Sequence, residues 1–343
     1  MITNIIFVVV ILFFTSISVG IVGNVIGIGG GILLVPFFLL YMHLSPVKAS
    51  GLSLFTILAS SSGGSFKFIK EKIIDFKLYL MIVLFAVPGV IAGSILSKYI
   101  KTDEFKGIFS LIIIIIGVFS LIATNIQTKK AENEIDLNID LNKVKSDYST
   151  NSFNIKKNKE INNKKESSNE NIKTLSGSGR NKNFKLKSII IYLKHIHISS
   201  DIKRKKIDRT GNTFDYYIKK PIVINFFSLT AGFVSGFIGI GIGGITGTFL
   251  TAVEQIPPRI AFSTIILAMI LTSVVGGFIH LSYMRFSYNA IIIYLIPLMI
   301  GAIIGSQLGV HISKLLNSRT LRLYQGWIII TLGLLMFAIS YIK

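Results

Sequence analysis

The first 47 residues of the chain, Met1–Val47, contain no Lys, Arg, Asp or Glu. A membrane helix needs only about 20 apolar residues to cross the hydrocarbon, so this run must turn back on itself. Four glycines within five positions mark the turn: Gly27, Gly29, Gly30 and Gly31. Glycine weakens a helix by about 1 kcal/mol relative to alanine. Irregular backbone at membrane depth is tolerated only inside protein or along a wet cavity. The stretch therefore predicts either a binding site or a tight interhelical turn.

The same pattern occurs a second time, at Gly239–Ile245. Its flanks are repeated as well. Ala49–Leu52 corresponds to Ala261–Thr264, and Gly89–Ser94 corresponds to Gly301–Ser306. The offset between the two copies is nearly constant, and this indicates an internal duplication.

The composition is 51% hydrophobic and 15% charged over 343 residues, which is typical of a membrane protein. Several uncharged runs are long enough to span a bilayer. We therefore expect an all-α polytopic membrane protein of two homologous, inverted repeats with glycine-broken helices, integral to the plasma membrane or an organelle membrane. Each repeat has four to five hydrophobic segments. They are 2–23, 31–42, 49–66, 78–97 and 107–127 in the first repeat (1–127), and 221–238, 245–253, 260–281, 288–313 and 323–342 in the second (221–343).

The connector between the repeats, residues 128–220, is rich in Asn, Lys and Ser. Between Gln127 and Lys220 there are 22 Lys and Arg against 11 Asp and Glu, so this segment holds more than half of the net charge of +20. Its low hydrophobicity predicts that most of it is disordered. A basic segment beside membrane helices favours contact with anionic lipid headgroups, and we expect no nucleic-acid partner.

The distribution of Lys and Arg over the loops supports inversion. In the first repeat they gather at Lys67–Lys77, between the third and fourth segments. In the second they gather at Lys314–Arg322, between the fourth and fifth. A shift by one loop is what an inverted repeat predicts under the positive-inside rule. Both loops and the connector are therefore expected in the cytoplasm, although Lys98, Lys101 and Lys106 oppose this assignment.

The hydrophobic repeats hold few chemically reactive groups. Their five acids lie in loops or at a helix edge, so no carboxylate pair is expected at mid-membrane. Cysteine is absent, and no nucleophile–base pair or metal-ligand cluster is visible. His195 and His197 in the connector are not expected to bind metal. The sequence therefore predicts a protein that is not an enzyme and has no cofactor. It sets no oligomeric state.

Glycine backbone and neutral hydroxyls remain as binding groups. Broken helices direct free N–H groups and positive dipole ends toward one point, which suits a small anion. The expected substrate-binding residues are Asn24, Gly27, Gly29, Gly30, Gly31, Ser53 and Thr56 in the first repeat, with Gly241, Gly243, Gly244, Ser263 and Thr264 in the second. For Asn24 a second role, as the cap of a half-helix, is slightly favoured over contact with the substrate.

Two other interpretations stay open. The glycines could serve only to let helices cross closely, in a membrane scaffold whose basic connector binds lipid or a partner. The same scaffold could also form a channel-like facilitator.

At these residues the chain resembles the sulfite exporter TauE/SafE family of membrane transporters. The matching features are Gly27–Gly31 followed by Val35-Pro36, the segment from Ala49 to Leu54, and Gly89–Ser94, together with their counterparts in the second half. The resemblance implies a multi-pass transporter of small inorganic or organosulfur anions such as sulfite or sulfonates. The chain departs from the family pattern at Ile245, where a third glycine is usual, and at Ile265, where the family commonly has Ser. Its connector is also longer than usual.

Overall fold

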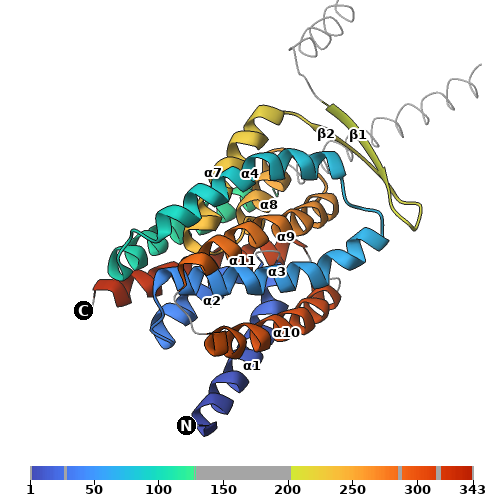
Figure 1. The fold of residues 1–343 in the computed structure, drawn as a ribbon. Helices are drawn as coiled ribbons and strands as arrows, with labels where there is room; N and C mark the ends of the chain where they lie inside the picture. Colours follow the sequence, from blue (N-terminus) through green and yellow to red (C-terminus); the bar gives the residue numbers. More distant parts are fainter. Residues whose placement is uncertain are drawn as a thin grey trace, which may run out of the picture. The chain divides into compact units, whose positions relative to one another are not determined.

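The computed structural model describes residues 2–26, 29–126, 128, 202–284, 288–313 and 318–341. The first half contains α1 (Ile2–Ile26), α2 (Gly31–Pro36), the π-helical segment η1 (Phe37–Tyr41), α3 (Pro46–Lys70), α4 (Phe76–Ser97) and the helix Thr102–Ile126. The second half contains α7 (Pro221–Ile238), α8 (Gly243–Ala252), α9 (Pro258–Tyr283), α10 (Tyr288–Ser313) and α11 (Ser318–Tyr341). Before α7, β1 (Ile202–Ile207) and β2 (Thr213–Ile218) form an antiparallel β-hairpin (Figure 1).

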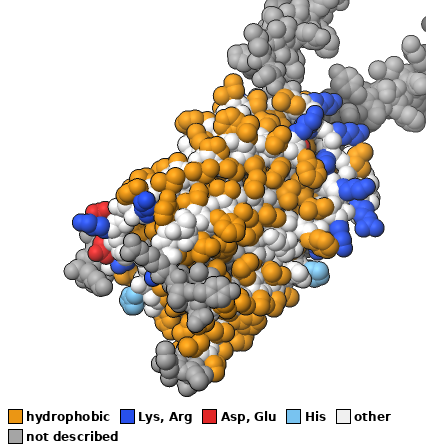
Figure 2. Space-filling model, viewed as in Figure 1, with side chains coloured by type: hydrophobic (Ala, Val, Ile, Leu, Met, Phe, Trp, Pro, Cys, Tyr) orange, Lys and Arg blue, Asp and Glu red, His pale blue; other side chains and the backbone are white. Residues whose placement is uncertain are grey.

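Seven of the described helices are long and apolar enough to cross a membrane. Large apolar side chains on their outer faces are exposed, such as Phe7, Leu84 and Phe226. Figure 2 shows hydrophobic side chains over the middle of the visible face and a group of Lys and Arg side chains near the β-hairpin. The protein is an integral, multi-pass membrane protein, as its composition predicted.

Equivalent helices of the two halves run antiparallel. Gly51, near the start of α3, lies against His280, near the end of α9, and Gly64 lies against Ile266. The helix Thr102–Ile126 and α11 follow the same rule, because Ile114 meets Gly333 and Leu121 meets Gly326. A two-fold rotation axis that superposes two antiparallel helices must be perpendicular to both of them. If the helices cross a membrane, that axis lies in its plane, and this is the inverted arrangement expected from the charge pattern.

Two further pairs run parallel and pack closely: α1 with α10, and α4 with α7. A Cβ placed on Gly93 of α4 would lie 2.1 Å from the carbonyl oxygen of Phe233, and one on Gly305 of α10 would lie 2.3 Å from that of Ile17. Glycines spaced by four residues allow this close approach of helix backbones. Since α1 is equivalent to α7 and α4 is equivalent to α10, each of these pairs joins a helix of one repeat to a helix of the other. Each repeat therefore packs mainly against the other.

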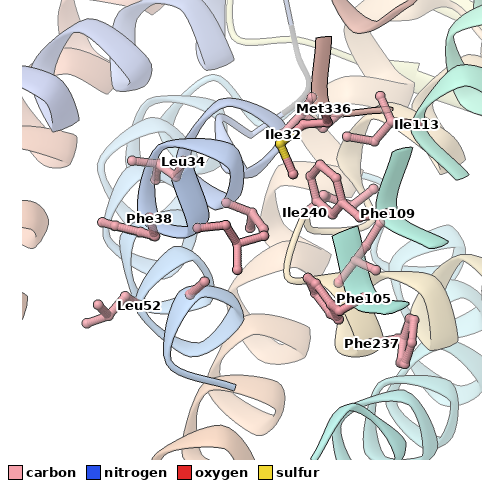
Figure 3. Close-up of a cluster of buried hydrophobic side chains, with 14 of the residues drawn as sticks. Ile32, Leu34, Phe38, Leu52, Phe105, Phe109, Ile113, Phe237, Ile240 and Met336 are labelled. Atoms are coloured by element: carbon pink, nitrogen blue, oxygen red, sulfur yellow. The ribbon is translucent and has the colours of Figure 1, made fainter. Parts of the chain in front are cut away.

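The apolar core anchors the segments around both glycine motifs. Ile32 of α2 and Ile240, which follows α7, belong to one buried cluster with Phe105 and Phe109 from the helix Thr102–Ile126 (Figure 3). Burying large aromatic side chains is a major source of stabilisation in such a core. The regions around the two motifs are thus fixed by the same helix.

The β-hairpin differs from the expectation of a mostly disordered connector over 128–220. Residues 202–218 pair in regular register, from Ile202 with Ile218 to Ile207 with Thr213, and belong to the same compact unit as the helices. Tyr216 and Ile218 are buried in a second apolar cluster that includes Ile73 and Leu78. Alternate residues of β2 therefore face the helices, which is the half-buried strand pattern. His195 and His197 lie outside the described residues.

Candidate functional site

The two glycine motifs meet in the centre of the helical unit. We call residues 27–31 the first glycine stretch and residues 239–244 the second. A Cβ on Gly31 would lie 2.7 Å from the carbonyl oxygen of Gly239. A Cβ on Gly29 would lie 2.2 Å from Cε of Met269, and one on Gly241 would lie 3.2 Å from the same atom. Segments separated by more than 200 residues are therefore in direct contact.

Both stretches surround the same two side chains. Ile57 of α3 touches the positions of Gly29, Gly31 and Gly241, and it is fully buried. Ile57 is the twelfth of 25 residues in α3, and Met269 is the twelfth of 26 in α9. The meeting point therefore lies at the middle of two helices that are long enough to span a bilayer.

Positive backbone φ angles explain why glycine is needed here. Gly29 has φ of 82° and its counterpart Gly241 has φ of 75°. Side chains with a Cβ rarely adopt this conformation. Gly30, which precedes α2, also has a positive φ of 79°, whereas Ile242, which precedes α8, has φ of −80°. An isoleucine is therefore tolerated at residue 242, and the two stretches are similar without being identical. Gly27 lies outside the described residues.

The predicted hydroxyls fall into two groups. Ser53 of α3 donates to the carbonyl oxygen of Gly239 at 2.6 Å, so it lies at the second glycine stretch. Thr56, one turn further, donates to Leu52 of its own helix. Ser263 and Thr264 lie elsewhere. Ser263 donates to the carbonyl oxygens of Ile260 and Ile73, and Thr264 accepts from the N–H of Asp75. Those two residues pack near the start of α9 against the loop that joins α3 to α4.

Asn24 lies within α1 and joins it to α3. Its side-chain amide donates to the carbonyl oxygen of Gly20 at 2.9 Å and to Oγ of Ser60 at 2.6 Å. The amide is therefore held beside the first glycine stretch, since Gly23, one residue before it, approaches Gly30. The remaining predicted glycines, Gly243 and Gly244, form the first turn of α8 and are buried.

Thr246 was not expected from the sequence. It lies in the first turns of α8, is 1% exposed, and its Oγ1 has no hydrogen-bond partner among the described residues. Ser50, whose Cα and Cβ lie beside Gly239, also has a buried hydroxyl without a partner. Buried hydroxyls normally have partners because an unsatisfied one is costly. The unpaired hydroxyl is what makes Thr246 a candidate for contact with a ligand, and only the three-dimensional structure reveals it.

A cavity of about 310 Å³ lies between α3 and α10. Its walls combine apolar and polar groups: Gly63, Gly64, Phe66, Lys67, Gln307, Val310 and His311. A Cβ on Gly64 would lie 3.4 Å from Oδ1 of Asn24, so the cavity adjoins the residue that holds the first glycine stretch. Lys67 makes its rim positive, and Gln307 adds an amide donor.

The carboxylates of the helical halves lie away from the glycine stretches. Glu71 and Asp75 are in the α3–α4 loop, Asp103 pairs with Lys106, and Glu254 accepts from the backbone N–H groups of Lys219 and Lys220. Of the histidines, His280 bonds the carbonyl oxygen of Gly236 at 2.8 Å. Within the described ranges no group of three or more His, Cys, Asp or Glu is arranged to hold a metal ion.

Comparison with known proteins agrees with this architecture. The family model described as Sulfite exporter TauE/SafE matches residues 12–161 and 206–342, which covers both helical halves. The chain belongs to the sulfite exporter TauE/SafE family. It is therefore a membrane transporter by family, which is consistent with the absence of enzymatic groups expected from the sequence.

Curated relatives carry the same general description. The chain is 23% identical over 331 residues to "Probable membrane transporter protein YunE" of Bacillus subtilis, covering 94% of this chain and 95% of the relative. It is 25% identical over 112 residues to "Probable membrane transporter protein YfcA" of Escherichia coli K12, covering 33% and 41% of the two chains. No solved structure matches this member of the TauE/SafE family.

Proposed function

We propose that the protein transports small anions of the sulfite or organosulfonate type, and that the anion binds where the two glycine stretches meet. The observation that carries this proposal is the contact of both stretches with Ile57 and Met269, at the midpoints of α3 and α9. Inverted-repeat transporters bind their substrates at the membrane midplane, where helices are interrupted.

The groups at this point suit an anion without holding it irreversibly. The first N–H groups of a helix have no intrahelical partner and carry partial positive charge. Both α8 and the segment Gly31–Tyr41 begin at the meeting point. Ser53 and Thr246 add neutral hydroxyls there. Because the described residues named at this point carry no charge, a bound anion is not trapped there by a strong ion pair.

Tight packing favours a transporter over a channel-like pore. Ile57 is 0% exposed and Met269 is 1% exposed, and together they fill the space between the stretches. A pore would need a continuous wet path, whereas a transporter needs a site that is closed in some of its states. In this view the cavity at Lys67 and Gln307 is the vestibule through which the anion approaches Asn24 and the first glycine stretch.

Uptake of labelled sulfite, sulfate and methanesulfonate into vesicles that contain the purified protein tests the proposal. We expect saturable uptake of at least one anion, and faster uptake across a pH gradient would identify proton coupling. Folded protein that moves none of the three would contradict the proposed substrate class.

The variant Thr246→Val tests the location of the site. Valine keeps the shape of threonine and removes only Oγ1, which has no hydrogen-bond partner in the part of the chain that the structure describes, so folding should be unaffected. We expect uptake to fall about tenfold, as for a lost hydrogen bond to a charged ligand. Thr251→Val is the matched control, because Thr251 is buried on the same helix and bonds only backbone carbonyls of that helix. Equal uptake by both variants would exclude Thr246 from the site.

A further inference from the structure

The β-hairpin joins the two repeats on one side of the molecule. We call this the hairpin side; the α3–α4 loop (Glu71–Asp75), the start of α9 and the end of α10 lie on it. The hairpin runs directly into α7 of the second repeat at Lys219-Lys220. The carboxylate of Glu254, after α8, accepts from both of these backbone N–H groups. The hairpin is therefore fixed to the second repeat by the chain itself and by Glu254.

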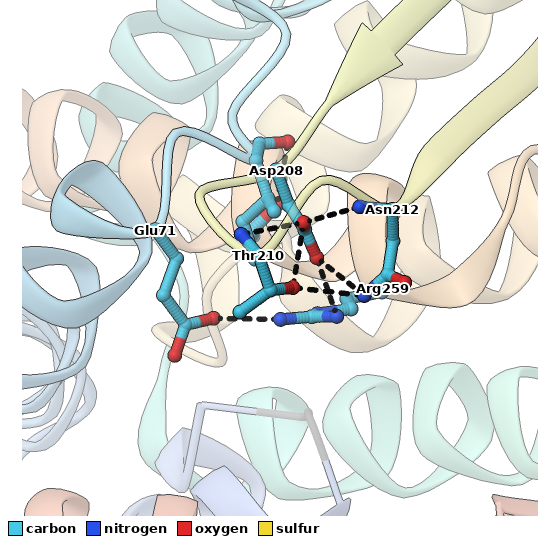
Figure 4. Close-up of polar contacts among 7 residues, drawn as sticks. Glu71, Asp208, Thr210, Asn212 and Arg259 are labelled. Carbon is cyan, nitrogen blue, oxygen red and sulfur yellow. Dashed lines mark hydrogen bonds and ion pairs between the residues drawn. The ribbon is translucent and has the colours of Figure 1, made fainter.

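A second contact fixes the turn of the hairpin to α9. Asp208 accepts hydrogen bonds from Thr210 and Asn212 within the turn, and from Nη1 of Arg259 at 3.1 Å (Figure 4). Arg259 is the second residue of α9. The side chain of Asp208 is only 1% exposed. The turn and the start of α9 thus move as one body.

Polar contacts from the hairpin to the first repeat involve two residues of the α3–α4 loop, and they add to the apolar packing of Tyr216 and Ile218 with Ile73 and Leu78. Asp75 accepts from Nη2 of Arg204 at 3.0 Å and from the hydroxyl of Tyr216 at 2.5 Å. It also caps α4 by accepting from the N–H groups of Lys77 and Leu78. Burial raises the pKa of Tyr216, and its hydrogen bond to Asp75 raises it further, so Tyr216 remains a donor to this carboxylate.

Glu71 provides the second contact. Its carboxylate accepts from Nη2 of Arg259 at 3.1 Å, and its backbone carbonyl oxygen accepts from the N–H of Arg209 at 3.1 Å. One guanidinium therefore bridges the hairpin turn and the α3–α4 loop. The Arg259 side chain is 43% exposed, so its pair with Glu71 is weakened by water and breaks more easily than the buried Asp75 contact.

The α3–α4 loop also follows the end of α3 that carries the cavity. Lys67 on the cavity rim is four residues before Glu71, and the N–H of Glu71 donates to its carbonyl oxygen. Movement of this end of α3 away from the second repeat would open the cavity toward the glycine stretches. The same movement must break the contacts at Asp75 and Glu71.

We propose that the β-hairpin is a latch that closes the hairpin side of the transport path, by holding the α3–α4 loop of the first repeat to the start of α9 in the second. This inference rests on the proposed transport function. The latch must release in each cycle for the hairpin side to open, as expected where one repeat moves against the other.

A reversible cross-link tests the latch, because the chain contains no cysteine to interfere. The double variant Glu71→Cys and Arg209→Cys places one cysteine in the α3–α4 loop and one in the hairpin turn. The backbones of these two residues are hydrogen-bonded, so the cysteines face each other across the contact that must break. Disulfides typically need Cα atoms about 4.4–6.8 Å apart, a separation that such a backbone contact meets. The double variant is reconstituted, and anion uptake is measured after oxidation and again after reduction. The two single variants are the controls for loss of the Glu71 carboxylate.

We expect oxidation to lower uptake at least about tenfold only in the double variant, and reduction to restore it. Equal uptake by the oxidised and reduced forms would overturn the latch. If the unaltered protein moves no tested anion, the proposed function fails, and hydrogen exchange then decides the latch separately. Slower amide hydrogen exchange in the peptide 71–75 after oxidation would show that the latch releases in the protein without the cross-link. Unchanged exchange would overturn the latch.

Discussion

A single methyl group at Gly31 tests whether the contact between the glycine stretches is functional. In Gly31→Ala the new Cβ would stand 2.7 Å from the carbonyl oxygen of Gly239 and 2.7 Å from Cδ1 of Ile57. Ordinary contact begins at 3.4 Å, so backbone and side chain must both move. Overpacking of this kind costs about 1–3 kcal/mol. If that cost falls on the anion-binding state, uptake should drop about 5- to 150-fold.

The assay compares initial uptake rates in vesicles with thermal unfolding in detergent. Gly107→Ala is the matched control, because a Cβ at Gly107 meets nothing within 4 Å. Adding Ile57→Val to Gly31→Ala removes Cδ1 of residue 57 but leaves the clash with the Gly239 carbonyl oxygen. The double variant should therefore recover only part of the lost uptake. Uptake by folded Gly31→Ala at the rate of the unaltered protein would show that the close contact between the glycine stretches is not needed for transport.

Two predictions concern the latch. Asp75→Ala removes the carboxylate that accepts from Arg204 and from the Tyr216 hydroxyl, and it removes the cap of α4. It should therefore lower the free energy of unfolding by about 3–5 kcal/mol. Asp103→Ala, at an exposed pair with Lys106, should change it by less than about 1 kcal/mol, and equal losses in denaturant unfolding would contradict the account. Burial favours a raised pKa for Asp208, but hydrogen bonds from Thr210 and Asn212 outweigh it and lower the pKa from 3.8 to about 2. The stabilisation by Asp208 is therefore full above pH 3.8 and is lost as the pH falls toward 2. The difference in Tm between Asp208→Asn and the unaltered protein should stay constant from pH 8 to 5, and a difference that vanished in that range would show that Asp208 is not held ionised by these bonds.

The repeat architecture was predictable because duplication and charge leave direct traces in a sequence. The offset between Gly29 and Gly241 identifies the two copies, and the move of Lys and Arg by one loop predicts inversion. The antiparallel packing of α3 on α9 follows from both. Long apolar segments are also easily recognised, since the bilayer requires about 20 apolar residues in each.

The site was less predictable, because side-chain partners depend on helix rotation and on packing between repeats. Ser263 and Thr264 were selected as neutral hydroxyls in the segment that follows the second glycine motif, yet they bond to the α3–α4 loop. Thr246 has no polar counterpart in the first repeat, where Leu34 occupies the matching position. The β-hairpin was missed because its apolar content is low, and its docking depends on carboxylates that belong to other segments.

Protection of a single cysteine by the anion tests directly whether the anion binds where the two glycine stretches meet. Ser53→Cys places the only thiol of the protein beside Gly239, where Ser53 now donates its hydrogen bond. Its rate of modification by a small anionic thiol reagent is measured with and without sulfate or methanesulfonate, and Gly107→Cys serves as the control. We expect a transported anion to slow labelling of Ser53→Cys and to leave labelling of Gly107→Cys unaffected. Labelling at residue 53 that is independent of every transported anion would contradict a binding site at the two glycine stretches.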